Sequence, residues 1–401
     1  MMTIRVYFEE DSPVQLWGLT PRQRLVKSLA PLSNVILADD ATSPGSGSDQ
    51  PGTDILVLRA DYIYDQRVLN GLLDSQTGQL ALTDPSDDSV VAVRACADQW
   101  SPNARPSLAN GPLSALKRLA PPAVASSEQS KLRKFDTPWV ARVSASARRR
   151  LENALFSAAY KGVTDLVTKW AWPLPARAVT RLCVRWGLRP NHVTSLSYVL
   201  AILAGVLFGY GEFGAGLLTG WIMTFLDTVD GKLARVTLTS SRFGNVFDHA
   251  LDLVHPPLWY IAWGVGLAAG TADVTMLLWL TVIGYVGGRL CEGGFKFAAP
   301  FSMFTWRPFD SVNRLVTARR NPNLILLTLA WWAGLPYIGL VLVTLWTLLS
   351  TLVLAVRLAQ GLLARAKGEP PRAWLYSDDP RAGRHPLMVR WFTFPAIRSG
   401  G

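Results

Sequence analysis

Long apolar stretches separated by short polar segments make up the carboxyl-terminal half of the chain. Most of them approach the ~20 residues that a helix needs to cross a bilayer. The pattern therefore predicts an α-helical membrane domain with six transmembrane helices within residues 190–365. The six predicted spans cover residues 192–211, 214–235, 244–268, 274–297, 321–335 and 337–357.

Residues 1–140 show a different pattern, in which short apolar runs alternate with helical stretches. The runs at 4–8, 34–38 and 54–61 have the length and composition of strands, whereas 21–29 has helical periodicity. Strands that alternate with helices are typical of an α/β layout. We therefore expect a soluble N-terminal α/β domain.

Basic amphipathic segments connect this domain to the apolar half. Residues 141–189 carry arginines at helical spacing, as in RRRLENAL and ARAVTRLCVRW. Such segments are typical of helices that lie on a membrane surface, with an ordinary linker helix as the alternative. Residues 366–401 form a second basic segment, which we expect to be a cytoplasmic tail.

Basic residues are distributed unevenly between the loops of the predicted membrane domain. The loops after the first and third spans carry Glu212 and Asp273, and the loop after the fifth carries no basic residue. Because loops rich in lysine and arginine stay in the cytoplasm, the pattern predicts cytoplasmic termini on a multi-pass protein of the inner (cytoplasmic) membrane. The basic residues at the ends of the second and fourth spans and in the loops that follow are Arg235, Arg242, Lys296, Arg307, Arg314, Arg319 and Arg320.

Composition narrows the classes of partner. The chain has 401 residues, 49% of them hydrophobic, and a net charge of +11. This charge suits an anionic membrane surface or anionic substrates. Nucleic acid is not expected, because the basic residues flank apolar spans and form no recognisable binding module. The three cysteines are far apart and predict neither a disulfide framework nor a zinc site.

The most informative feature is a set of aspartates and small residues at helical spacing. Asp227 and Asp230 lie in D-T-V-D-G-K-L-A-R, and at ~100° per residue they share one helix face with Gly231 and Ala234. After a short turn, G-N-V-F-D-H-A-L-D places a second such group on the next helix. That group consists of Gly244, Asp248 and Asp252.

Four carboxylates crowded at a membrane boundary repel one another and lose hydration. A divalent cation would offset this cost. Hard oxygen ligands suit Mg²⁺ or Mn²⁺, which share their coordination with substrate phosphates. The small residues leave room for a bulky ligand, and Arg235 can donate charge-assisted hydrogen bonds to a phosphate. Solvated acids at two helix ends are the structural alternative.

This spacing resembles the signature of the CDP-alcohol phosphatidyltransferase family, D-x2-D-G-x2-A-R-x8-G-x3-D-x3-D, at every fixed position. The resemblance covers about 185–300. It implies transfer of a phosphatidyl or related group from a CDP-alcohol, usually CDP-diacylglycerol, to an acceptor hydroxyl with release of CMP. It also implies that Asp252 is the general base. The implied metal ligands are Asp227, Asp230, Asp248 and Asp252.

The resemblance also implies a set of substrate contacts. The turn between the two helices offers the Ser241 hydroxyl as a hydrogen-bond donor to a phosphate, and the segment PNHVT offers Asn191 as a CDP contact. The alternative for Asn191 is a helix N-cap. The implied nucleotide and diphosphate site comprises Gly231, Ala234, Arg235, Ser241, Gly244 and Asn191.

Further along, three charged residues recur at helical spacing. Arg289 or Lys296 could bind a phosphate on the acceptor, whereas an Arg289–Glu292 pair within one helix is the alternative. His255 precedes two prolines and is expected to pack at a kink. The identity of the acceptor alcohol stays open.

The N-terminal domain resembles sugar-nucleotidyltransferases at LVLRADYIYD, which contains Asp61, and at KFDTP. The Gly-rich phosphate loop of that family is missing, because the equivalent segment reads FEEDSPVQLW. We therefore expect a degenerate, non-catalytic domain. The alternative is a bifunctional enzyme whose N-terminal domain makes a CDP-linked or inositol-phosphate-type substrate.

A different class, an ion-coupled membrane transporter, predicts acids spread along a pore and repeated halves. The acids here gather at one depth, which favours the enzyme. The expected partners are the CDP-alcohol, the acceptor alcohol and membrane lipid, with a homodimer as an open option.

Overall fold

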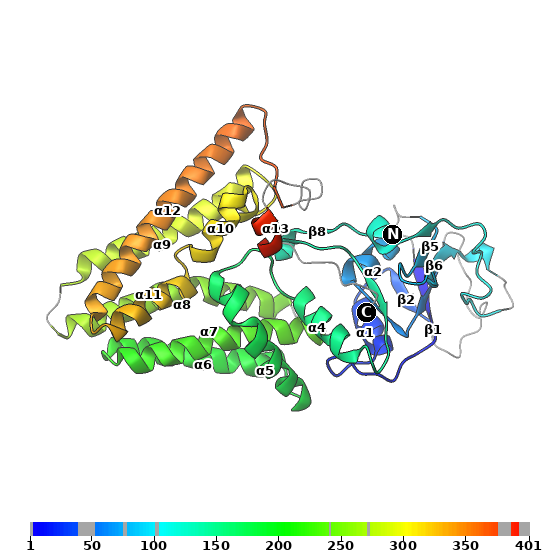
Figure 1. Cartoon of the computed structure of the whole chain (residues 1–401), viewed down its shortest axis with the longest axis horizontal. Coiled ribbons are helices and arrows are strands. Elements are labelled where there is room, and N and C mark those ends of the chain that lie inside the picture. Colours follow the sequence, from blue (N-terminus) through cyan, green and yellow to red (C-terminus); the bar gives the residue numbers. More distant parts are fainter. Residues whose placement is uncertain are drawn as a thin grey trace.

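The computed structural model has two parts, a sheet domain and a helical half of residues 148–366, joined side by side (Figure 1). Side chains of residues 242–252, 386 and 389 are not among those described. The structure describes residues 3–38, 53–74, 78–100, 104–239, 242–270, 273–375 and 386–392.

The N-terminal sheet has six strands in the order β2-β1-β3-β6-β5-β7. β1 is parallel to β2 and β3, β6 is antiparallel to β3 and β5, and β7 is parallel to β5. Strands and helices alternate along this part, so the predicted α/β domain is confirmed. The sheet strands are β1 Ile4–Glu9, β2 Val35–Leu37, β3 Asp54–Arg59, β5 Leu80–Thr83, β6 Val90–Cys96 and β7 Arg118–Leu119.

Apolar side chains of the strands alternate between two cores, as the period of a strand requires. One face packs against α1 (Pro21–Leu29), α2 (Gln66–Leu73) and α3 (Pro121–Val124). The other face packs against Trp100 and the leucines that follow it, after the short helix η2 (Ala97–Gln99). A buried ion pair joins Arg94 to Asp54 at 2.8 Å across this sheet.

Two small two-stranded sheets and several short helices lead from the sheet to the helical half. β4 (Tyr62–Tyr64) pairs with β10 (Val140–Arg142), and β8 (Glu128–Gln129) pairs with β9 (Lys134–Phe135). The remaining short elements here are η3 Ser130–Leu132, α4 Arg148–Ala158, the π-helix η4 Val167–Ala171 and α5 Pro173–Arg185.

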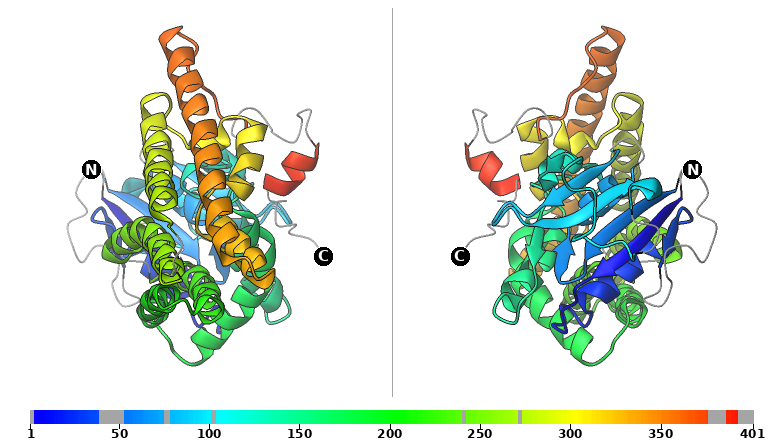
Figure 2. Two further views of the ribbon diagram at one scale, coloured as in Figure 1. Left: turned by 90° about the vertical axis from the view of Figure 1, so that its left-hand side faces the viewer. Right: turned by 90° about the vertical axis from the view of Figure 1, so that its right-hand side faces the viewer.

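Six helices occupy the positions of the six predicted spans, and Figure 2 shows them from two further sides. Within the described ranges, two of them, α6 and α12, are long and apolar enough to cross a membrane. The six segments are thus confirmed as helices, whereas six membrane crossings stay a prediction. The bounds are α6 Pro190–Gly209, α7 Phe213–Val236, α8 Arg242–Ala268, α9 Thr275–Gly294, α11 Arg320–Trp332 and α12 Pro336–Ala366.

Shorter helices complete this half between α9 and α11 and after α12. α10 (Pro308–Val316) brings its polar face against α12, where Arg357 and Asp310 form a buried ion pair with atoms 2.6 Å apart. The others are η5 Phe295–Phe297, η6 Met303–Thr305 and α13 Pro386–Phe392.

Tryptophans of α8 fix the packing of the bundle. Trp259 Nε1 donates to the Ala201 carbonyl of α6 at 2.8 Å, and Trp263 Nε1 donates to the Pro336 carbonyl of α12 at 3.1 Å. Both indoles are almost fully buried. Buried indole N–H groups need such partners, so these bonds set the position of α8 relative to its neighbours.

The sheet domain is bonded to the end of α7. Arg24 Nη1 of α1 donates to the Val236 carbonyl at 2.6 Å, and Lys27 Nζ lies 3.4 Å from the Thr237 carbonyl. Cations at a helix C-terminus satisfy its last carbonyls and its dipole. The α/β domain therefore holds the end of the helix that carries the aspartate motif.

Candidate active site

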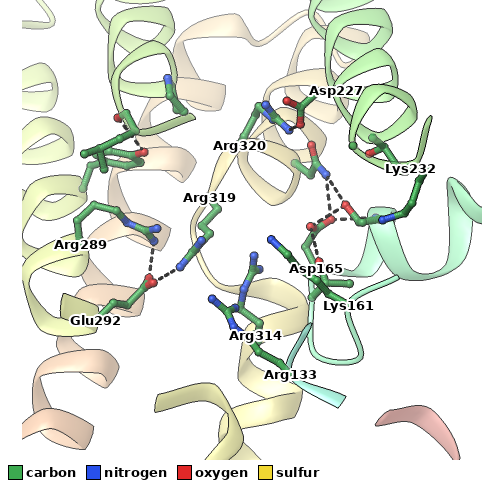
Figure 3. Close-up of a pocket in the computed structure, with 18 of the residues that line it drawn as sticks. Arg133, Lys161, Asp165, Asp227, Lys232, Arg289, Glu292, Arg314, Arg319 and Arg320 are labelled. Carbon is green, nitrogen blue, oxygen red and sulfur yellow. Dashed lines mark hydrogen bonds and ion pairs between the residues drawn. The ribbon is translucent and has the colours of Figure 1, made fainter. Parts of the chain in front are cut away.

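A cavity of about 540 Å³ lies beside the aspartate motif, and we call it the central pocket (Figure 3). Its walls come from five regions of the chain: the loop segments before α5, then α7, α8, α9, and the segment of α10 and α11. The described residues that line it are Arg133, Lys161, Thr164, Asp165, Thr168, Asp227, Thr228, Gly231, Lys232, Arg235, Leu253, Pro256, Tyr285, Arg289, Glu292, Arg314, Arg319, Arg320 and Asn321.

Three of the predicted residues of α7 face this pocket: Asp227, Gly231 and Arg235. They lie one turn apart, as the helical spacing predicts. A carboxylate oxygen of Asp227 lies 2.5 Å from Arg320 Nη2 of α11. Asp230 points to α6, where it accepts a hydrogen bond from Thr194 Oγ1 at 2.7 Å. The motif thus supplies acidic oxygens on two adjacent faces of α7.

Some predicted residues are placed elsewhere or lie outside the described set. Ala234 is half-buried and does not line the pocket. Ser241 lies outside the described residues, and so do the surroundings of Gly244 and the side chains of Asp248 and Asp252. The α8 backbone is helical at residues 244, 248 and 252. Leu253 and Pro256 on the same helix line the pocket directly after Asp252.

The N-cap alternative for Asn191 is wrong. α6 begins at Pro190, and its N-cap residue is Arg189. Proline favours the first helical position because its fixed φ suits the helix and its missing N–H is not needed there. Asn191 therefore falls inside the first turn, where it is exposed and does not line the central pocket.

Arg289 and Lys296 differ in their positions. Arg289 lines the pocket and also forms the helical ion pair with Glu292, at 2.5 Å. Arg319 binds the other oxygen of the same carboxylate. Lys296 is exposed, outside the pocket wall.

His255 packs edge-on against Trp259 at 5.0 Å between ring centroids.

Three arginines surround one buried ring at the far end of the pocket. The guanidinium carbons of Arg133, Arg314 and Arg319 lie 5.7, 5.5 and 5.6 Å from the centroid of Phe304. A ring face attracts cations, but a shared ring offsets little of their mutual repulsion. We call this group the arginine cluster, and Figure 3 shows its members around the pocket.

Arg314 is the least compensated member of the arginine cluster. It is 7% exposed, and its Nε and Nη1 atoms have no hydrogen-bond partner among the described residues. Burial holds the pKa of Arg314 well below its usual value, and the nearby Arg319 lowers it further. A buried, unpaired guanidinium is costly unless an anion binds to it. The cluster therefore has the chemistry of an anion site.

Arg133 reaches the pocket from the hairpin that follows the sheet domain. Its backbone is left-handed at φ 49°, and its carbonyl accepts a bond from Val163 N at 3.0 Å. A Cβ on the adjacent Gly162 would lie 2.5 Å from that carbonyl oxygen, so only glycine fits there. This close contact fixes the arginine against the helical half.

Asp165 is the buried acid of the pocket floor. It accepts hydrogen bonds from Asn321 Nδ2 at 2.9 Å and from the backbone N–H of Thr168 at 3.0 Å. Burial alone would raise the pKa of Asp165, but the charge of Arg314 and these hydrogen bonds outweigh it and lower the pKa. Asp165 therefore stays ionised and partly balances the cluster.

In the sequence, Arg314, Arg319 and Arg320 indicate only the orientation of the loops. No sequence pattern indicates a role for Arg133, Lys161 or Asp165. The one usable signal was the excess of arginine between the fourth and fifth spans. The others come from segments far upstream, whose approach to the motif no local pattern indicates.

Asp61 of the sheet domain forms ion pairs that connect two strands. Its carboxylate pairs with Arg59 at 2.8 Å and with Arg142 at 3.3 Å, and it is 6% exposed. These ion pairs tie β3 and β10 together. The resemblance of this domain to nucleotidyltransferases stays a prediction.

Residues 188–294, which include the aspartate motif, match the family model of CDP-alcohol phosphatidyltransferase. A phosphatidylinositol phosphate synthase from Mycobacterium marinum is 29% identical over 126 residues, which cover 29% of this chain and 54% of that protein. Cholinephosphotransferase 1 from Danio rerio is 28% identical over 158 residues, covering 36% and 38%.

A bifunctional IPC transferase and DIPP synthase from Rubrobacter xylanophilus is 39% identical over 84 residues, which cover 21% of this chain and 19% of that protein. The chain thus spans about half or less of the length of these curated relatives. A solved Mycobacterium tuberculosis phosphatidylinositol phosphate synthase with CDP-DAG bound aligns over 46% of this chain and 90% of its own, at 20% identity and a TM-score of 0.31.

Proposed function

We propose that the chain transfers a phosphatidyl or related phospho-alcohol group from a CDP-alcohol, with CDP-diacylglycerol as the first candidate, to an acceptor hydroxyl in phospholipid biosynthesis. CMP is the second product. One observation carries the proposal: Asp227, Gly231 and Arg235 of the family signature lie together on the wall of a large, cation-rich pocket. A diphosphate needs such an environment.

Mg²⁺ or Mn²⁺ fits the donor atoms of the motif. Asp227 already holds a cationic group, Arg320, at 2.5 Å, and Asp230 lies one turn away with hard oxygen atoms of the same kind. Within the described residues, no three His, Cys, Asp or Glu side chains gather as a metal site. We propose that Asp248 and Asp252 complete the set. The ion would neutralise charge on the diphosphate and on the departing CMP.

The reaction itself is a displacement at the β-phosphorus. The acceptor oxygen forms a bond to this phosphorus, the bond from phosphorus to the CMP oxygen breaks, and CMP leaves with the electron pair. The proton of the acceptor hydroxyl passes to the Asp252 carboxylate, the proposed general base. Gly231 leaves open space beside Arg235, because a Cβ there would meet only the end of that side chain, at 3.4 Å.

A backbone carbonyl in the segment before α5 fixes the position of the Arg235 guanidinium. Its Nη1 donates to the Ala159 carbonyl at 2.7 Å, and Lys232 Nζ lies 3.3 Å from the same oxygen. This anchoring restricts the rotation of both side chains. We propose that the Arg235 guanidinium binds the diphosphate, since charge-assisted bonds to phosphate are short and strong.

The arginine cluster indicates which kind of acceptor alcohol the pocket can bind. Eight lysines and arginines line the pocket against three described acids, Asp165, Asp227 and Glu292. The excess at the Phe304 end favours an acceptor that carries its own phosphate over a neutral alcohol. Arg289 belongs to this end, whereas the exposed position of Lys296 gives it no contact there.

Replacing Arg314 with glutamine is expected to raise the KM for a phosphorylated acceptor about 10- to 100-fold and to change kcat less. A charged hydrogen bond contributes about 1.5–3 kcal/mol, and ~1.4 kcal/mol corresponds to a tenfold change. Steady-state kinetics on purified protein would measure this. Arg365→Gln, on an exposed arginine of α12, is the matched control. An unchanged KM in Arg314→Gln would remove the acceptor assignment.

We further propose that the protein is a multi-pass protein of the inner membrane with both termini in the cytoplasm. Two helices, α6 and α12, can each cross a membrane, and the basic loops support this orientation. Reporters that are active only in the cytoplasm are expected to give a signal when fused to either terminus, and reporters that are active only in the periplasm are expected to give none. A periplasmic signal from either end would overturn the orientation.

The proposed function is tested by CMP release from CDP-diacylglycerol by the purified full chain. The acceptor panel pairs glycerol phosphate and inositol phosphate with the unphosphorylated alcohols. We expect CMP and a new phospholipid with at least one phosphorylated acceptor. If a folded, metal-supplied protein consumes no CDP-diacylglycerol and no other CDP-alcohol with any acceptor, the proposal fails.

A further inference from the structure

A second cavity lies next to the central pocket, on the side of α5, and we call it the lateral cavity. Its volume is about 520 Å³. The end of α4, the π-helix η4, the start of α5 and the short helix α13 form its walls. Trp170 and Trp391 meet edge-on across it, with ring centroids 5.7 Å apart. No role in the proposed transfer reaction involves this cavity.

The charge of the lateral cavity is entirely basic. Four cationic residues line it, and no acid is found among its described lining residues. A wall of like charges is unfavourable by itself and becomes favourable when an anion is bound. The four cationic residues are Lys161, Lys169, Arg177 and Arg390.

Exposed apolar side chains accompany these cations. Leu174 is 69% exposed and Trp170 53% exposed, and both line the cavity. Further along α5, Trp186 is 68% exposed. A helix with exposed tryptophan and leucine beside arginines is typical of one lying at a membrane interface. The cavity therefore combines a cationic interior with an apolar, membrane-compatible rim.

The position of Lys169 supports binding of an anion. Its Nζ donates to the Gly162 carbonyl at 2.8 Å and lies 5.0 Å from the ring centroid of Phe392. Burial lowers the pKa of Lys169 to about 8. A nearby phosphate would stabilise the charged ammonium and restore a higher pKa.

We propose that the lateral cavity binds the phosphate headgroup of an anionic phospholipid from the surrounding membrane, as a bound lipid distinct from both substrates. The basic interior binds the phosphate, and the exposed Trp170 and Leu174 contact the upper acyl chains. Lys161 lines both cavities, so the bound lipid lies directly beside the central pocket.

Native mass spectrometry of the full chain in detergent tests this inference. The probes are dioleoyl-phosphatidylglycerol and dioleoyl-phosphatidylcholine, which differ in headgroup charge. We expect tighter binding of the first phosphatidylglycerol molecule. Each basic residue near an anionic headgroup contributes about 1 kcal/mol, so the double variant Lys169→Gln/Arg177→Gln should bind it about 30-fold more weakly.

Matched variants separate the site from general surface charge. Arg185→Gln removes an exposed arginine of the same helix α5 outside the cavity and should leave binding unchanged. Arg390→Gln, an exposed residue of α13 at the cavity wall, should weaken binding without disturbing the α5 packing. Equal binding of the two lipids, or full binding by both cavity variants, would overturn the proposal.

A competition arm distinguishes the two sources of phosphate. Soluble glycerol phosphate should displace phosphatidylglycerol only weakly, because it lacks the acyl chains that contact the rim. Displacement at equal molar concentration would show a site for free phosphomonoesters and would refute the lipid assignment. None of these measurements uses the transfer reaction, so the outcome is independent of the proposed function.

Discussion

Replacing Asp252 with asparagine is expected to reduce turnover about 10²- to 10⁴-fold, the usual contribution of a positioned general base. Asparagine keeps the size and one oxygen atom of the side chain but cannot take up the proton of the acceptor hydroxyl. Binding of the CDP-lipid should therefore be largely retained. Single-turnover CMP release and equilibrium binding of a CDP-lipid, measured on the same protein, separate the two effects.

Asp273→Asn is the control for this variant. Asp273 is an exposed acid in the loop before α9, where its carboxylate accepts a hydrogen bond from Thr275 N at 3.0 Å. It should behave as the unmodified protein does. If Asp252→Asn keeps near-normal turnover, the base is another group.

Removal of divalent metal is expected to bring CMP release down to the uncatalysed background, with recovery on addition of Mg²⁺ or Mn²⁺. The carboxylates of α7 repel an incoming diphosphate, although Arg320 pairs with Asp227. Because both partners are anionic and partly removed from water, the repulsion is much stronger than in bulk solvent. Dialysis against a chelator, followed by metal titration, measures the effect.

A second measurement links the metal to the motif without using activity. Binding of Mn²⁺ can be followed by the loss of its free-ion electron paramagnetic resonance signal. Asp230→Asn should weaken this binding, whereas Asp273→Asn should not. Full activity after exhaustive chelation would contradict the metal assignment. Unchanged Mn²⁺ binding in Asp230→Asn would contradict it as well.

The features of the structure that the sequence predicted are those with a local period. β1 begins at the predicted Ile4, and β3 begins at the predicted Asp54, because alternating or continuous apolar runs specify strands directly. The helical spacing of Asp227 and Gly231 likewise placed both on one wall of the pocket. In each case, neighbours within one element carry the information.

What the sequence could not predict depends on contacts between distant segments. Arg133 reaches the pocket only because Gly162 lets two backbones approach closely. Asp165 gains its partner Asn321 from a helix 156 residues away. Even the local expectation for Asn191 failed, since Pro190 outweighed it as the start of α6. The periodicity of the sequence indicates neither these long-range contacts nor the residue at which α6 begins.

The bonds from α1 to the end of α7 limit how this protein can be rearranged. Arg24 and Lys27 donate to the Val236 and Thr237 carbonyls, which adds to the capping that α7 draws from its own Thr237 and Thr239. The α/β domain is therefore not an exchangeable module, despite its separate hydrophobic core. A chimera that joins this bundle to a foreign domain would need to carry residues 17–27 with it, or the aspartate-bearing helix would fray from its motif end.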